Sequence, residues 1–220
     1  MAAGFYGKVP MRGDFVGRLL GQDFIQPWDG WLQSVLQAGQ TSLEEAWLDR
    51  YLNSPIWYFV LGAGQCGPVA MVGVMIASVD SVGRYFPLTI AAPLEGRPAP
   101  ALAALAVSAW CAAAETVALG ALEPETTFTA FESAVASLAV PDVAAEIPAG
   151  PAVTPITDGL AASLLRVAAD PGEASGISVW WTEGTPDTPG VSLRVDGLPP
   201  PGQAVALFDG QWERWGWIRR

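Results

Sequence analysis

Apolar residues recur at helical spacing in the first quarter of the chain. Along residues 24–36 they fall on one face at three- and four-residue steps, which predicts an amphipathic helix with Pro27 in its first turn. Ser42 and Glu45 then have the spacing of a capping box. The pattern therefore predicts a second helix that begins there and ends near Asn53.

Three near-continuous apolar runs follow, at residues 56–62, 68–78 and 84–93. They are rich in β-branched and aromatic residues and are separated by short glycine-containing turns, which predicts an antiparallel meander. Because polar residues hardly alternate with the apolar ones, we expect helices to cover both faces of this sheet.

The rest of the chain alternates between helical and extended patterns, with one stretch in which Pro, Gly and Ala dominate. The predicted segments are helices at about 99–121 and 124–139, a linker at 141–155, a helix at 157–170, and strands at 176–184 and 190–197 joined by the turn TPDTPG. We expect the last two strands to extend the same sheet, which indicates a layered α/β domain.

The excess of acidic over basic residues excludes some classes of binding partner. The 220 residues include 22 acidic and 11 basic ones, so the formal net charge of −11 repels nucleic acid and anionic membrane surfaces. The N-terminus lacks the apolar core of a signal peptide, and no segment offers eighteen uninterrupted apolar residues. We therefore expect no nucleic-acid partner and no direct membrane insertion.

The sequence contains few candidates for catalytic or metal-binding residues. Histidine is absent, which removes the commonest general base, and Cys66 and Cys111 are lone cysteines without metal-ligand spacing. We expect buried, inert thiols, a reduced cytosolic setting, no metal and no cofactor. An enzyme would need paired carboxylates, for which Asp14, Asp29 and Asp80 are the only candidates within distinctive motifs. The absence of histidine, of a metal-ligand cluster and of an activated nucleophile argues against an enzyme.

The stretch GFYGKVPMRGDF, residues 4–15, contains three glycines and the only lysine of the chain, Lys8. It fails the phosphate-loop pattern, which requires Ser or Thr directly after the lysine. We predict a glycine-shaped strand and turn whose Lys8, Arg12 and Asp14 lie near the 78–88 hairpin, forming a pairing network or a charged surface patch. The alternative is an anion site in which Lys8, Arg12 and Arg84 converge on phosphate.

Three further stretches stand out. In SVDSVGRYFPL, residues 78–88, Asp80 suits a turn, and Arg84 suits either clamping a carboxylate such as Asp80, Asp29 or Asp14, or binding a partner. In QPWDGWL, residues 26–32, Trp28 and Trp31 flank Asp29 at helical spacing, which favours a place in the core. The tail WERWGWIRR predicts a surface contact or a docked terminal strand, with neither favoured.

Taken together, these stretches resemble the TagF family, also called ImpM, of type VI secretion-associated proteins. Four motifs occur in the family's order and spacing, densely over residues 4–94 and thinly beyond, and the tail has no counterpart in the family pattern. The matching positions are Gly4, Phe5, Gly7, Lys8, Gly13, Asp14, Phe15, Trp28, Asp29, Trp31, Ser78, Asp80, Gly83, Arg84, Phe86 and Pro87.

The resemblance implies a single domain over residues 1–220, a three-layer α/β/α sandwich with a mixed, largely antiparallel sheet. It also implies a cytoplasmic, non-enzymatic accessory protein of the bacterial type VI secretion system. Such a protein would be a posttranslational repressor that binds a forkhead-associated scaffold component. The alternative is a phosphate- or nucleotide-sensing domain that uses Lys8, Arg12 and Arg84.

Overall fold

The computed structural model describes residues 2–94, 100–141, 176–186 and 188–218. Seven strands form one sheet in the order β2-β1-β5-β4-β3-β6-β7. The strands are β1 (Gly4–Gly7), β2 (Val16–Arg18), β3 (Trp57–Leu61), β4 (Met71–Ile76), β5 (Leu88–Pro93), β6 (Ile177–Thr185) and β7 (Thr188–Asp196).

Every strand pair in the described part of the chain is antiparallel. The predicted meander is confirmed as β3-β4-β5, and β6 and β7 extend it beyond β3 as expected. The mixed sheet was a wrong prediction, because β1 meets β5 in the antiparallel sense after the chain has passed through α1 and the meander. The β6–β7 connection is also shorter than the predicted turn, since Thr185 already pairs with Thr188.

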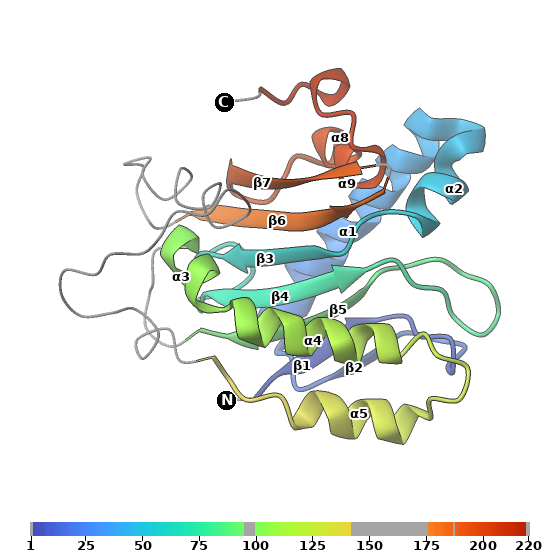
Figure 1. Ribbon diagram of the computed structural model, residues 1–220, viewed down its shortest axis with the longest axis vertical. Helices are drawn as coiled ribbons and strands as arrows, with labels where there is room; N and C mark the ends of the chain where they lie inside the picture. The colour runs from blue at the N-terminus through green and yellow to red at the C-terminus, as the bar shows by residue number, and fades with distance from the viewer. Residues whose placement is uncertain (1, 95–99, 142–175, 187, 219–220) are drawn as a thin grey trace.

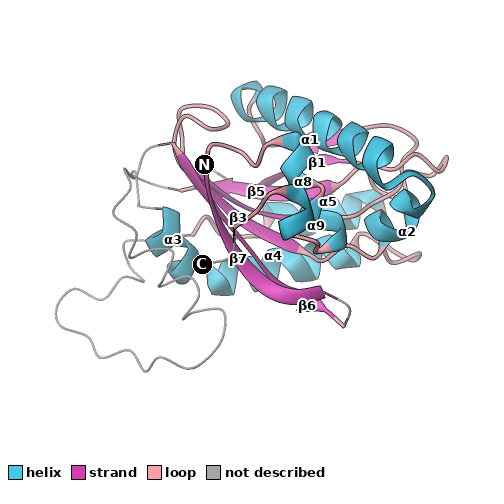
Figure 2. Cartoon of the chain, turned by 90° about the horizontal axis from the view of Figure 1, so that it is seen from above, coloured by secondary structure: helices cyan, strands magenta, loops and turns pink. Residues whose placement is uncertain are grey.

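Helices lie over both faces of the sheet (Figures 1 and 2). Figure 1 shows α4 crossing the near face and α1 running behind the sheet. The helices are α1 (Gln22–Leu43), α2 (Trp47–Leu52), α3 (Pro100–Ala106), α4 (Ser108–Gly120), α5 (Phe128–Ala136), α8 (Pro201–Ala204) and α9 (Ala206–Asp209), with 3-10 turns η1 (Glu44–Ala46) and η2 (Glu213–Trp215).

The unbroken hydrophobicity of the central strands reflects burial on both faces. All five residues of β3 are buried, and their side chains alternate between two cores. Trp57, Phe59 and Leu61 join the core that contains α1, whereas Tyr58 and Val60 join the core that contains α4. The three-layer sandwich and the single domain stay predictions.

The helix boundaries depart from the sequence pattern in three places. Gly21 is the N-cap of α1, so Pro27 lies inside the helix and not in its first turn. The capping box is wrong, because α1 continues through Ser42 and the chain turns only at Glu44, where φ is 47°. The helix predicted at 99–121 is divided into α3 and α4 at Val107.

Residues 212–218, the described part of the tail, do not form a terminal strand. Trp212 is buried, and the 3-10 turn that follows it brings Trp215 and Trp217 back against the core that contains α1. The Trp215 indole donates to Asp209 at 2.9 Å, and the Trp217 indole donates to the Gln203 carbonyl at 2.8 Å. The predicted linker at 141–155 and helix at 157–170 lie outside the described residues, apart from the buried Pro141.

Candidate functional site

A tight hairpin connects β4 to β5 and places Asp80 at its centre. Val79 and Tyr85 form an isolated bridge, and the Asp80 N–H donates to the Arg84 carbonyl at 3.0 Å. Gly83 completes the turn with φ at +85°, a left-handed backbone conformation that residues other than glycine rarely adopt. The turn that Asp80 predicted is therefore present.

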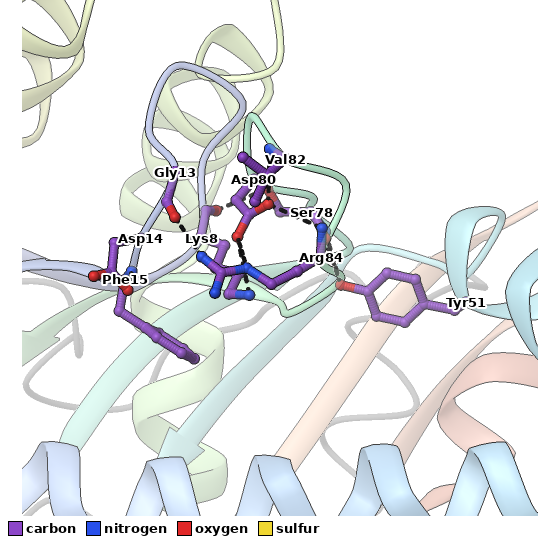
Figure 3. Close-up of polar contacts among 9 residues, drawn as sticks. All are labelled: Lys8, Gly13, Asp14, Phe15, Tyr51, Ser78, Asp80, Val82 and Arg84. Carbon is purple, nitrogen blue, oxygen red and sulfur yellow. Dashed lines mark hydrogen bonds and ion pairs between the residues drawn. The ribbon is translucent and has the colours of Figure 1, made fainter.

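The Asp80 carboxylate is out of contact with solvent but has four donors (Figure 3). The backbone N–H groups of Val82 and Arg84 donate to Oδ1 at 3.0 and 2.9 Å. Lys8 Nζ lies 3.0 Å and Arg84 Nε 2.8 Å from Oδ2. Burial by itself opposes ionisation, but these N–H groups and cations outweigh it and hold the pKa of Asp80 well below its usual range.

The same hairpin is fixed to the loop between β1 and β2. The Ser81 N–H donates to the Arg12 carbonyl at 2.9 Å, and the Ser78 hydroxyl donates to the Lys8 carbonyl at 2.8 Å. The Arg84 Nη2 group donates to the Gly13 carbonyl (Figure 3). The predicted proximity of the opening stretch and the hairpin is thus observed, and it takes the form of a pairing network around Asp80.

Helix α2 holds the hairpin from another side. The buried Tyr51 hydroxyl donates to the Ser78 carbonyl at 2.8 Å and accepts from the Ser78 N–H at 3.0 Å. Burial raises the pKa of Tyr51 above its ordinary value, so this hydroxyl stays protonated. The Tyr51 ring also meets the Tyr85 ring at 5.9 Å. Three segments distant in sequence are therefore locked together at one end of the sheet.

The other predicted residues lie elsewhere. The Arg12 guanidinium stacks on the Phe128 ring at 4.5 Å, and Asp14 accepts the N–H of Phe15 on an exposed loop. Asp29 accepts from the Tyr6 hydroxyl at 2.7 Å. Burial of Tyr6, and then this hydrogen bond, raise the pKa of that tyrosine. Lys8 and Arg84 share Asp80 while Arg12 points to Phe128, so the three cations of the anion-site alternative do not converge.

Trp28 and Trp31 are core residues, as their spacing favoured. Trp28 is completely buried, and its indole donates to the Thr89 hydroxyl at 3.0 Å. The Trp31 indole donates to the Pro199 carbonyl at 2.7 Å. Both side chains stabilise the packing of α1 on the sheet.

Sequence reasoning missed several members of the network. Tyr51 lies within the second predicted helix, but the sequence pattern gave it no polar partner. The contribution of Gly13 is a backbone carbonyl, which no side-chain pattern reveals. Phe15 matched a family position, but nothing in the sequence showed that this residue would be 43% exposed. Nor did it show that Lys8 Nζ would lie 5.0 Å from the centre of its ring.

Exposed apolar side chains gather on these same three segments. We call this region the hairpin surface and define it by Phe15, Leu48, Leu52, Val82, Arg84 and Tyr85. In Figure 1 the β1–β2 loop, the β4–β5 loop and α2 all lie at one side of the molecule. Five of the nine large apolar residues found exposed in the described parts of the chain belong to this surface.

The described residues contain two buried thiols and no cluster of metal ligands. No group of three or more Cys, Asp and Glu side chains among them could hold a metal ion. Burial raises the pKa of Cys66 to about 12 and that of Cys111 further above its ordinary value, so both buried thiols stay protonated and weakly nucleophilic. Within the described ranges, no helix is both long and apolar enough to cross a membrane.

Comparison with known proteins agrees with the motifs. Residues 4–138 match the family model for the TagF N-terminal domain, Type VI secretion system-associated. The crystal structure of PA0076 from Pseudomonas aeruginosa PAO1 is similar to this fold with a TM-score of 0.77 and 35% sequence identity, over 100% of this chain and 97% of that one. A search of the curated proteins finds no relative of this chain. The chain therefore belongs to the TagF family of type VI secretion system-associated proteins.

Proposed function

We propose that this protein is a non-enzymatic repressor of the type VI secretion system that acts after translation, in the cytoplasm, by binding a forkhead-associated scaffold component. Membership of the TagF family supports the link to secretion. The proposed framework is a three-layer α/β/α sandwich over the whole chain, with the hairpin surface at one end of its sheet.

The hairpin surface is the observation that carries the proposal. A buried ion-pair network fixes its backbone, while Val82, Tyr85, Phe15 and the outer part of Arg84 stay exposed. Aromatic and arginine side chains on a rigid support are the type that dominates binding energy at protein interfaces, because little conformational entropy is lost on docking. Such a surface suits the recognition of a protein better than the turnover of a small molecule.

The mechanism follows from occupancy. A scaffold that is bound by this protein cannot recruit the other components of the apparatus, so repression should increase with the ratio of this protein to the scaffold. No chemical step is needed, which fits the protonated thiols and the paired carboxylates.

The test is titration calorimetry of the purified protein with the forkhead-associated scaffold encoded in the same secretion cluster. We expect saturable binding, and we expect secretion to fall as the cellular amount of this protein rises. A forkhead-associated domain from an unrelated pathway is the matched control. If the scaffold shows no heat of binding while a different component of the apparatus binds, the proposed partner is wrong.

A further inference from the structure

The Arg84 guanidinium is held ready for a ligand at its outer edge. Nε is bound to the Asp80 carboxylate at 2.8 Å, and Nη2 donates to the Gly13 carbonyl. Within the described residues nothing pairs with Nη1, and the side chain is 54% exposed. An arginine that is already ordered loses little entropy when it donates two parallel hydrogen bonds to an anionic group.

The ion pair with Asp80 does not prevent Arg84 from binding a second anionic group. Its carboxylate is shared with Lys8, whose side chain is 6% exposed, so two cations face one buried anion. The excess positive charge is therefore carried by the more exposed of the two, Arg84. A bound carboxylate would complete the pairing with a charge-assisted hydrogen bond.

The charge around Arg84 contrasts with that of the whole chain. The segments that form the hairpin surface carry Lys8, Arg12, Arg50 and Arg84 against Asp14, Asp49 and Asp80, whereas the protein has a net charge of −11. Arg50 is exposed and makes no ion pair within the part of the chain that the structure describes. An acidic partner would therefore be repelled less by this end of the molecule than by the remainder, with Arg84 and Arg50 among the exposed cations.

We propose that the hairpin surface binds an acidic segment of the scaffold, with one Asp or Glu carboxylate on the free edge of Arg84 and apolar side chains against Phe15, Val82 and Tyr85. The identity of the partner rests on the proposed function, whereas the chemistry of the bound segment rests on the geometry of Arg84. The mixture of exposed apolar rings and one ordered arginine fits a segment in which acidic and apolar residues alternate.

The first experiment is calorimetry of the scaffold against the wild type, Arg84→Gln and Arg214→Gln over a range of sodium chloride concentrations. Arg84→Gln leaves the Lys8–Asp80 pair in place, and Arg214 is a matched control because it stacks on Trp215 away from the hairpin. We expect Arg84→Gln to weaken binding by about tenfold or more and to reduce its salt dependence. Arg214→Gln should leave the affinity unchanged within about twofold.

A second variant distinguishes weaker binding from loss of folding. Val82 is 66% exposed at the tip of the hairpin, so Val82→Ser removes apolar contact area without opening the core. We expect it to weaken scaffold binding while the thermal unfolding temperature stays unchanged. Wild-type affinity in both folded variants would overturn the proposed surface and leave the scaffold as the partner.

The second experiment does not depend on the scaffold. A peptide that alternates glutamate with leucine is titrated into isotopically labelled protein while the Arg84 Nε–H resonance is followed by NMR, beside the same peptide with glutamine for glutamate. We expect shifts in the hairpin surface with the glutamate peptide and markedly smaller shifts with the glutamine peptide. Shifts here without scaffold binding would retain the surface and reject the partner, whereas no shift at Arg84 would overturn the inference.

A second copy of this chain is the competing occupant. Sedimentation of the wild type and Val82→Ser distinguishes it, because an interface between copies gives a concentration-dependent dimer that the substitution weakens. We expect a monomer at all concentrations. A dimer that is lost in Val82→Ser would assign the surface to self-association and overturn the proposal.

Discussion

Asp80 is a carboxylate that stays ionised although it is out of contact with solvent. Desolvation by burial favours the protonated form, but two backbone N–H groups and two cations favour the ionised form more strongly, so the pKa lies below the ordinary value. The lowered pKa thus depends on the folded hairpin. Folding and ionisation are linked, and the stability of the protein must change with pH.

We predict that Asp80→Asn lowers the free energy of unfolding at neutral pH, because it leaves Lys8 buried without an anion. The pKa of Asp80 is depressed in the folded state, so its stabilisation is present above about pH 4, the ordinary aspartate pKa, and is lost as the pH falls below that value. Urea denaturation at a series of pH values should show the gap between wild type and variant closing in acid.

Two variants locate the effect. Lys8→Met should cost less, roughly 1–3 kcal/mol, because Asp80 keeps Arg84 and two N–H donors. Asp14→Asn on the exposed loop should change stability by no more than about 0.5 kcal/mol. A larger loss for Lys8→Met than for Asp80→Asn would show that the network is not centred on Asp80.

At the scale of the element, α1 contains two glycines with opposite surroundings. An added Cβ at Gly30 meets nothing within 4 Å, whereas one at Gly39 would lie 2.4 Å from the Trp47 ring. Alanine is the better helix former, so propensity alone would favour both substitutions. Packing decides between them.

We predict that Gly30→Ala stabilises the protein by about 0.5–1 kcal/mol and that Gly39→Ala destabilises it by roughly 1–3 kcal/mol. The first change restricts the unfolded chain without a clash, and the second pushes Trp47 away from α1. Each variant serves as the control for the other in thermal and urea unfolding. Equal stabilisation by both would mean that Trp47 moves freely.

These elements show where local patterns predict structure and where they do not. The spacing of Trp28 and Trp31 gave the buried face of α1 correctly, because that face is set by core packing. Pro27 and Ser42 gave wrong helix ends, because α1 begins before the proline and continues past the serine. Local signals for the start and end of a helix are weak compared with tertiary contacts. For α1 and the β3-β4-β5 meander the element type followed the sequence, whereas the ends of α1 did not.

At the scale of the whole molecule, the candidate site was predictable only in part. Lys8, Asp80 and Arg84 were named from two charged turns, and their meeting required only that these turns be neighbours. Arg12 and Asp14 share a loop with Lys8 but point elsewhere, since sequence adjacency does not set side-chain direction. Tyr51 and the Gly13 carbonyl enter through tertiary contacts that no local pattern encodes.

The family match at residues 4–138 ends before two strands of the sheet. Strand β6 pairs with β3, and Trp180 on β6 is completely buried. Its ring packs against those of Trp28 and Phe59, with ring centres 5.9 and 5.2 Å away. The Trp57 indole also donates to the Leu207 carbonyl. The C-terminal segment therefore completes the core that contains α1.

We predict that a fragment of residues 1–141 does not fold, because it exposes the edge of β3 and leaves the tryptophans of α1 without Trp180. Near-ultraviolet circular dichroism and thermal unfolding should show native tryptophan packing and a cooperative transition in the full chain and neither in the fragment. Ile218→Ser in the full chain is the control, since this side chain is 85% exposed and should unfold like the wild type. A fragment with a cooperative transition would mean that the matched residues form an independent core, and that β6 and β7 are added to it without being required.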